Sequence, residues 1–285
     1  MKDPFVTFVP TINGGGMEIA MDCEKVVQTL SNVVNKLKQE NQVDNVIIKN
    51  DIFKILEKHC IVLYYPVADE DNRGFHTKRA VNNEMKDFVY INTAKPLAEQ
   101  VFTAAHELGH VWDVKGKVLE ELPECEDYVT KKEEKIINRF AAELLMPKKV
   151  FRKTFYEHLK DADFVHKPIT LKDFVRIIVM QMNDFMVPYE AVKRRLLETE
   201  MITEEVALSL DKHNSEIELL VMSFSKEQNT LLDQATRKKT IPGLRKLWEK
   251  VEAEKCLDEY RISKIKKDFD LDTVSSPDEV VTITG

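Results

Sequence analysis

The stretch FTAAHELGHVW, residues 102–112, decides the fold, because it contains the pattern H-E-x-x-H from His106 to His110. Residues four apart lie one above the other on a helix face, so both imidazoles can converge on one metal ion. Glu107 projects beside that ion, where it can take a proton from a bound water. Apolar residues at helical spacing predict that the stretch is a helix. The alternative is a chance pair of exposed histidines, but the chain has only 7 His. The pattern therefore predicts a zinc site.

A second predicted helix, residues 132–147, supplies the third protein ligand that a catalytic zinc site needs beside its open position for water. Glu134 and Asn138 are four apart and share one side of this helix. Glu134 is the predicted metal ligand, and Asn138 is the predicted hydrogen-bond partner of a liganding histidine. Glu133 is the alternative ligand, but it lies about 100° away around the helix. For either acid, a solvated charge is the remaining interpretation.

Four motifs resemble the ImmA/IrrE family of zinc metallopeptidases and occur in the family's order. They are FVYIN at 88–92, FTAAHELGH at 102–110, EKIINRFAAELLMP at 134–147 and FMVPYEAVKRRL at 185–196. The resemblance covers roughly residues 52–202. The chain departs from the family at Pro188, where serine is usual, and at Ile136, where a second acid is common. Residues 1–50 and roughly the last 80 residues match nothing in the family.

The resemblance implies a zincin-like catalytic core and an intracellular endopeptidase whose cofactor is Zn²⁺. It also implies that the substrate is a helix-turn-helix transcriptional repressor, whose cleavage derepresses genes. The residues themselves leave three functions open. These are a site-specific zinc endopeptidase, a zinc hydrolase acting on another amide, and a non-catalytic protein that binds and sequesters a regulator. The oligomeric state does not follow from the sequence.

The pattern along the chain predicts an α+β fold that is mainly helical, in four regions. They are a flexible segment with an amphipathic helix at 1–50, a zincin-like catalytic domain at 51–160, a helix-turn-helix-like region at 161–212, and a helical C-terminal extension with an acidic disordered tail at 213–285. We expect the amphipathic helix, which starts at Asp22, to pack on the core rather than to bind a partner.

Three short strands, at 60–66, 75–81 and 88–92, precede the metal helix and predict a small antiparallel sheet beside it. An edge strand of such a sheet can hold an extended substrate by β-addition. The sequence does not tell which strand is the edge. His76 lies in this sheet, and we expect it on the surface rather than in the cleft.

The helix Leu171–Met182, a short break and a helix after Pro188 resemble a helix-turn-helix. Lys193, Arg194 and Arg195 on the second helix make DNA contact conceivable. The net charge of −7 argues against a protein built mainly to hold nucleic acid. We therefore favour packing of this pair against the catalytic domain.

The stretch from Gly116 to Thr130 is rich in acids, and we expect a solvated loop, with a cleft rim for basic substrate segments as the alternative. The group that stabilises the oxyanion of the reaction is not evident. Tyr128, His158 and His166 are candidates, although a structural role is the simpler interpretation of each.

The composition is typical of a soluble protein, with 43% hydrophobic and 32% charged residues among 285. Mean hydropathy is −0.33, and no apolar run approaches the ~20 residues of a membrane span. The first residues lack the basic and apolar regions of a signal peptide. The four cysteines are scattered without a C-x-x-C pair. We therefore expect reduced thiols, no membrane contact and a cytoplasmic protein.

Overall fold

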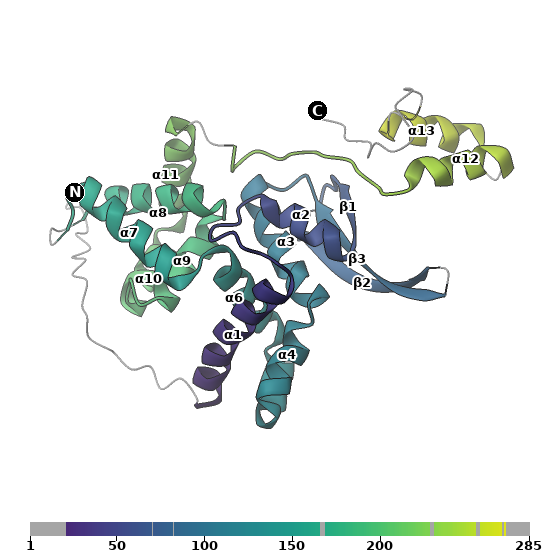
Figure 1. Ribbon diagram of the computed structural model, residues 1–285. Coiled ribbons are helices and arrows are strands. Elements are labelled where there is room, and N and C mark those ends of the chain that lie inside the picture. The colour runs from purple at the N-terminus through teal and green to yellow at the C-terminus, as the bar shows by residue number, and fades with distance from the viewer. Residues whose placement is uncertain are drawn as a thin grey trace.

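The computed structural model describes residues 21–69, 71–81, 83–165, 169–228, 231–254, 257–269 and 271, and the predicted mainly helical α+β class is confirmed. The first helices are α1 (Met21–Glu40), α2 (Asp51–His59), α3 (Leu97–Val111), α4 (Val114–Glu121), α5 (Glu126–Lys131) and α6 (Glu133–Leu145). The later ones are α7 (Lys148–Asp161), α8 (Leu171–Phe185), α9 (Tyr189–Glu198), α10 (Glu204–Lys212), α11 (Asn214–Glu227), α12 (Leu244–Glu254) and α13 (Glu259–Phe269) (Figure 1).

Within the described ranges, no helix combines the length and the apolar character needed to cross a membrane. The predicted flexible segment before residue 21 and the acidic tail after residue 271 lie outside those ranges. The four predicted region boundaries stay a prediction.

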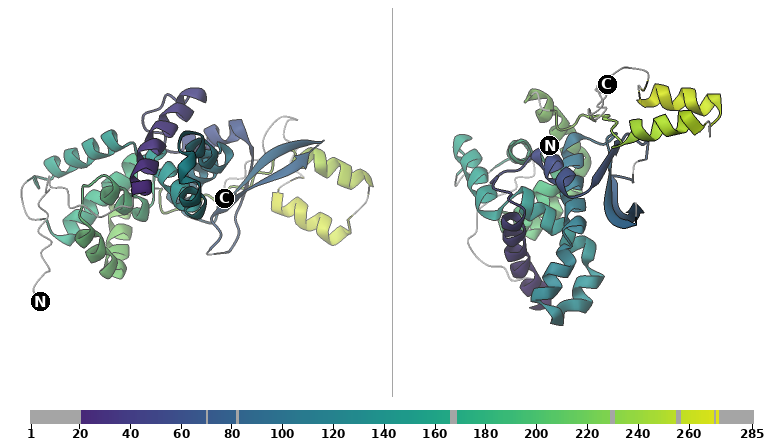
Figure 2. Two further views of the ribbon diagram at one scale, coloured as in Figure 1. Left: turned by 90° about the horizontal axis from the view of Figure 1, so that it is seen from below. Right: turned by 45° about the vertical axis from the view of Figure 1, so that its right-hand side comes forward.

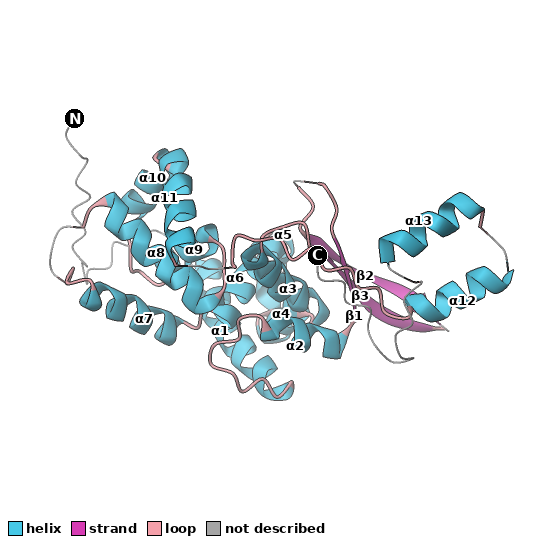
Figure 3. Ribbon diagram, turned by 90° about the horizontal axis from the view of Figure 1, so that it is seen from above, coloured by secondary structure: helices cyan, strands magenta, loops and turns pink. Residues whose placement is uncertain are grey.

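The strands β1 (Ile61–Tyr65), β2 (Gly74–Val81) and β3 (Glu84–Asn92) form one sheet in the order β1-β3-β2. The strand β2 pairs with β3 as an antiparallel hairpin, whereas β1 pairs with β3 in parallel. The prediction of an antiparallel sheet was therefore wrong for one of the two pairs. The reason is the connection after β1, which leads to β2 at the opposite edge of the sheet (Figure 3). The hairpin then returns the chain, so that β3 lies between β2 and β1.

The helix α1 packs on the core, as expected. Its apolar face is buried, and α1 lies against α4 and α6. The buried residues on that face are Val26, Leu30, Val33, Val34 and Leu37.

The acidic stretch from Gly116 to Thr130 is not the solvated loop that the sequence predicted. Most of its residues belong to α4, to α5 and to a short 3₁₀ turn between them, Pro123–Cys125. Buried Val118, Cys125 and Val129 explain the difference, since they give this charged stretch an inner face.

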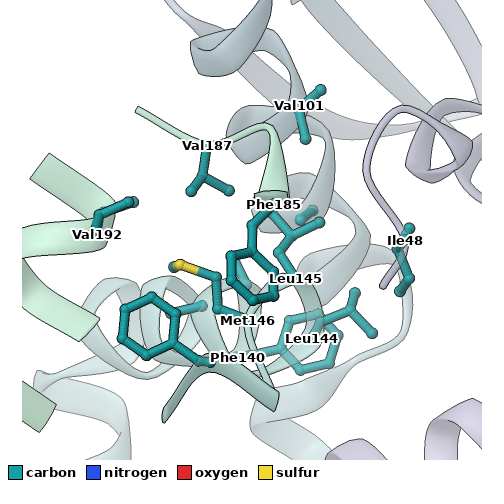
Figure 4. Packing of buried hydrophobic residues seen from close by; sticks show 14 of the residues in the cluster. Ile48, Val101, Phe140, Leu144, Leu145, Met146, Phe185, Val187 and Val192 are labelled. Atoms are coloured by element: carbon teal, nitrogen blue, oxygen red, sulfur yellow. The ribbon is translucent and has the colours of Figure 1, made fainter. Parts of the chain in front are cut away.

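The helices α7 to α11 lie on one side of α3 and α6, and the sheet lies on the other (Figures 1 and 3). The core between α6 and this helical group is continuous. Figure 4 shows Phe140 of α6 and Met146, which follows α6, with Phe185, Val187 and Val192 from the α8–α9 pair. The helix-turn-helix-like pair is thus packed against the helix that carries Glu134.

The three basic residues on α9 do not form a free basic surface. Arg195 is 1% exposed, and its Nε donates to the carbonyl of Met146 at 2.9 Å. Lys193 donates to Asp211 at 2.7 Å. Arg194 alone among the three is exposed. The DNA-contact alternative therefore loses two of the three side chains on which it depended.

An irregular segment, residues 231–240, crosses the start of α3. The first N–H groups of a helix have no partner within the helix. Here the N–H groups of Leu97 and Ala98 donate to the carbonyls of Gln234 and Leu232, at 2.9 and 3.1 Å. The C-terminal region therefore completes the hydrogen bonding of the helix that carries the H-E-x-x-H pattern.

The same segment closes one edge of the sheet. Thr240 and Tyr64 exchange two backbone hydrogen bonds of 2.9 Å along the outer side of β1. In the described part of the chain, no strand pairs with the outer side of β2. The edge strand that the sequence left open is therefore β2, on the side of the sheet away from residues 231–240.

The helices α12 and α13 follow this segment and form a hairpin that stands apart from the helical group (Figure 2). Phe269 of α13 contacts Tyr65 of β1, with ring centroids 5.5 Å apart. Lys239 also donates to the carbonyl of Asp268 at 2.9 Å. These contacts attach the hairpin near the β1 edge.

Leu232→Ala is expected to lower the free energy of unfolding by about 2 kcal/mol, the low end of the range for a buried leucine, because an irregular segment relaxes into the space left behind. Leu232 is 4% exposed, whereas its neighbour Leu231 is 62% exposed. Urea denaturation of both alanine variants checks the prediction. Equal stability of the two variants would show that residues 231–240 do not hold α3 in place.

Candidate metal centre

The histidine pair lies on α3, and a glycine lets α6 approach that helix closely. A Cβ atom added to Gly109 would lie 2.9 Å from Phe140 and 3.0 Å from Ile137, closer than ordinary packing allows. Both neighbours belong to α6. The glycine inside the motif therefore has a structural reason, because it allows side chains of α6 to reach the histidines.

Three potential ligands converge between these helices. The Nε2 atoms of His106 and His110 are 3.3 Å apart. The Glu134 carboxylate places one oxygen 3.2 Å from His106 Nε2 and the other 3.6 Å from His110 Nε2. Four donors at 2.0–2.1 Å in a tetrahedron lie about 3.3 Å from one another. The three side chains fit a zinc ion with one position left open, and among the described residues they alone form such a group.

Asn138 lies behind the first histidine. Its Oδ1 is 3.0 Å from Nδ1 of His106, the ring nitrogen that points away from Glu134. A hydrogen bond there fixes which nitrogen carries the proton and leaves the other as a metal ligand. The structure thus brings Asn138 to the position that the sequence predicted for it.

Glu133, the alternative ligand, lies outside this group. Its Oε2 accepts from Lys115 Nζ at 2.7 Å, and its Oε1 is 4.0 Å from His110 Nδ1. It therefore lies behind the second histidine and not in front of it.

Glu107 is only 5% exposed. Burial, and then the charge of nearby Glu134, raise the pKa of its carboxyl to about 7. Burial also lowers the pKa of His110, and neighbouring His106 lowers it further, while Glu134 and Glu133 oppose this shift. A carboxyl whose pKa lies near neutrality is suited to accept and return a proton.

His76 lines the site, contrary to the expectation of a surface histidine. Its ring stacks on that of His110, with centroids 6.1 Å apart and an interplanar angle of 3°. Its Nε2 lies 2.6 Å from Asp87 Oδ1 on β3. The sequence did not reveal this position, because it depends on which face of β2 turns toward α3. The pairing of β2 with β3 is the feature that sets it.

Of the three candidates for stabilising the oxyanion, only His158 loses support. His158 lies 2.6 Å from Asp184, between α7 and α8, in another part of the fold from the metal ligands. His166 is outside the described residues. Tyr128 is half-buried on α5, and an oxyanion-stabilising role for it stays a prediction.

Metal-free protein is expected to lose stability as the pH rises from about 5 to about 8. The pKa of Glu107 is about 7 in the folded chain against an ordinary value of 4.5, so the folded state holds this proton more tightly. The buried charge therefore costs no stability below about pH 4.5. Its cost grows between pH 4.5 and about pH 7, and it is complete above about pH 7. Glu107→Gln removes that charge.

The variant is therefore expected to be more stable than the original protein by about 1–3 kcal/mol at about pH 8, with little difference at about pH 5. Urea denaturation in the presence of a chelator measures this. Glu121→Gln, at an exposed position, is the control. Equal stabilities of the original protein and Glu107→Gln at about pH 8 would show that the charge of Glu107 carries no cost of burial.

Comparison with known families agrees with the geometry. Residues 57–197 match the model of the family Peptidase_M78, described as the IrrE N-terminal-like domain. The match runs from α2 through α9, and therefore includes the sheet, both metal-site helices and buried Arg195. No curated protein matches the chain.

Proposed function

Because residues 57–197 of this chain belong to the Peptidase_M78 family, we propose that the protein is a zinc-dependent endopeptidase. The family is a peptidase family, and the convergence of His106, His110 and Glu134 is the observation that carries the proposal for zinc. Two imidazoles and one carboxylate are a ligand set found in catalytic zinc sites, which keep the fourth position for water or substrate.

The chain's own residues account for the proton transfers. A zinc ion held by His106, His110 and Glu134 would lower the pKa of its water and polarise the scissile carbonyl. The carboxylate of Glu107 accepts a proton as the water oxygen adds to the carbonyl carbon. The same carboxyl then donates this proton to the amide nitrogen as the C–N bond breaks. One peptide bond and one water thus give a carboxylate and an amine.

The free edge of β2 supports cleavage within a chain. The strand β2 packs against α3, and His76 places it beside the ligand His110. An extended peptide that adds to β2 would run past the metal site and continue on both sides of it. Such a path favours an endopeptidase that binds a segment of a protein over a hydrolase for a short peptide or another small amide.

The substrate that we propose is a helix-turn-helix transcriptional repressor, whose cleavage derepresses genes. The support is the chain's membership in the family, together with the resemblance of its four motifs to ImmA/IrrE peptidases. The test is incubation of the purified protein with candidate repressors, followed by mass spectrometry of the products.

A single cleavage site, lost with a chelator and restored by zinc, would support the proposal. Zinc-dependent cleavage of short peptides without cleavage of any repressor would favour a hydrolase for another amide. Binding of a repressor that is unchanged by the chelator, without products, would favour a sequestering protein and overturn the enzyme.

A further inference from the structure

The two metal-binding histidines use their ring nitrogens in the same way. In both rings, Nε2 is the atom within 3.6 Å of the Glu134 carboxylate. Each ring therefore keeps Nδ1 on its outer side. A histidine that binds a metal through one nitrogen carries a hydrogen on the other, and that N–H needs an acceptor.

The acceptor for His106 is Asn138, at 3.0 Å. For His110, the carboxylate facing Nδ1 is that of Glu133, at 4.0 Å. The other carboxylate near this part of the site, Asp87, is already paired with the Nε2 of His76. In the described part of the chain, Glu133 thus has the carboxylate oxygen that faces the outer nitrogen of His110.

Glu133 is itself held in place. Its second oxygen accepts from Lys115 Nζ at 2.7 Å, and both side chains are about one-third exposed. Lys115 lies on α4 and Glu133 begins α6, so the ion pair joins two helices. With Oε2 occupied by Lys115, Oε1 is turned toward His110. Closing the 4.0 Å gap to hydrogen-bond length takes about 1 Å of movement.

We propose that Glu133, held by Lys115, is the positioning residue for His110. Its Oε1 accepts the hydrogen on Nδ1 and so keeps Nε2 free and aimed at the cation. The two histidines then have two outer partners from one helix, Asn138 and Glu133, while Glu134 of the same helix supplies the ligand. This inference rests on the proposed zinc site, and it assigns to Glu133 a role that is neither metal ligand nor surface charge.

The zinc dissociation constant, measured by competition with a chromophoric chelator, tests the inference. Glu133→Ala is expected to weaken zinc binding about 10- to 100-fold, the usual effect of losing an outer partner of a ligand. Glu133→Gln keeps an acceptor oxygen and is expected to recover part of the loss. Lys115→Met is expected to weaken binding less than Glu133→Ala, and to add nothing when Glu133 is already alanine.

Another lysine–glutamate pair, within α4, provides the control. Lys117 donates to Glu120 at 3.1 Å, and Glu120 is exposed. Lys117→Met and Glu120→Ala are expected to leave the dissociation constant unchanged. The melting temperature of the metal-free protein is expected to change little for Glu133→Ala and for these controls, because each change removes one partly exposed lysine–glutamate pair.

Cobalt substitution distinguishes a positioning residue from a ligand. The visible spectrum of the Co²⁺ form of Glu133→Ala is expected to keep the shape of the original, whereas loss of a ligand would change it. An unchanged zinc dissociation constant, or an altered cobalt spectrum, would overturn the role of Glu133 while leaving the zinc site in place. If the original protein bound no zinc, both this inference and the proposed function would fail.

Discussion

Glu107→Gln is expected to lower kcat/KM for peptide hydrolysis about 10²- to 10⁴-fold, the contribution of a positioned general base. The amide has nearly the same shape as the carboxyl but cannot accept the proton of the attacking water. His106, His110 and Glu134 are untouched, so the zinc content is expected to remain at about one ion per chain. Steady-state kinetics and metal analysis on the same preparation check both parts.

The matched control for this variant is Glu121→Gln, which makes the same chemical change at an exposed position on α4. Its kcat/KM is expected to equal that of the original protein. Retention of full activity in Glu107→Gln would assign proton transfer to another group. Loss of zinc together with activity would mean that the buried carboxyl helps to build the site rather than to perform the chemistry.

Arg195→Met is expected to lower the free energy of unfolding by about 3–5 kcal/mol, the usual cost of removing one partner of a buried ion pair. The guanidinium donates to the carboxylates of Glu143 and Glu198 and to the carbonyl of Met146. Without it, Glu143 loses this charged partner and the carbonyl of Met146 loses its donor, whereas Glu198 keeps Arg139 at 3.7 Å.

The adjacent residue gives the control, because Arg194 is exposed and Arg194→Met is expected to change stability by less than about 0.5 kcal/mol. Chemical denaturation of the two variants provides the comparison. If both variants had the same stability, the α8–α9 pair would not be anchored to α6 through Arg195.

The two residue pairs of the candidate metal centre were predictable from the sequence, because the members of each pair are only four residues apart. The histidines of α3 are four residues apart, as are Glu134 and Asn138 of α6, and the helical period alone puts each pair on one face. The helical period does not predict that α3 and α6 pack against each other. Gly109 permits the close approach, but a glycine in a helix does not reveal its neighbour from the sequence.

The features that the sequence missed depend on contacts between distant segments. His76 reaches His110 because the hairpin of β2 and β3 packs against α3. Residues 231–240 supply carbonyls to the start of α3 through backbone hydrogen bonds, which no side-chain pattern predicts. The charged partners of Arg195 are Glu143 of α6 and Glu198 in the next turn of α9. The burial of Arg195 therefore follows from the packing of α9 against α6.

The zinc content of purified protein after dialysis tests the metal centre itself. We expect about one zinc per chain for the original protein and for Glu121→Gln, and loss of zinc from His106→Ala, with each variant still folded by circular dichroism. An original protein without zinc, or a His106→Ala variant that holds as much zinc as the original, would contradict the assignment of His106, His110 and Glu134 as a metal centre.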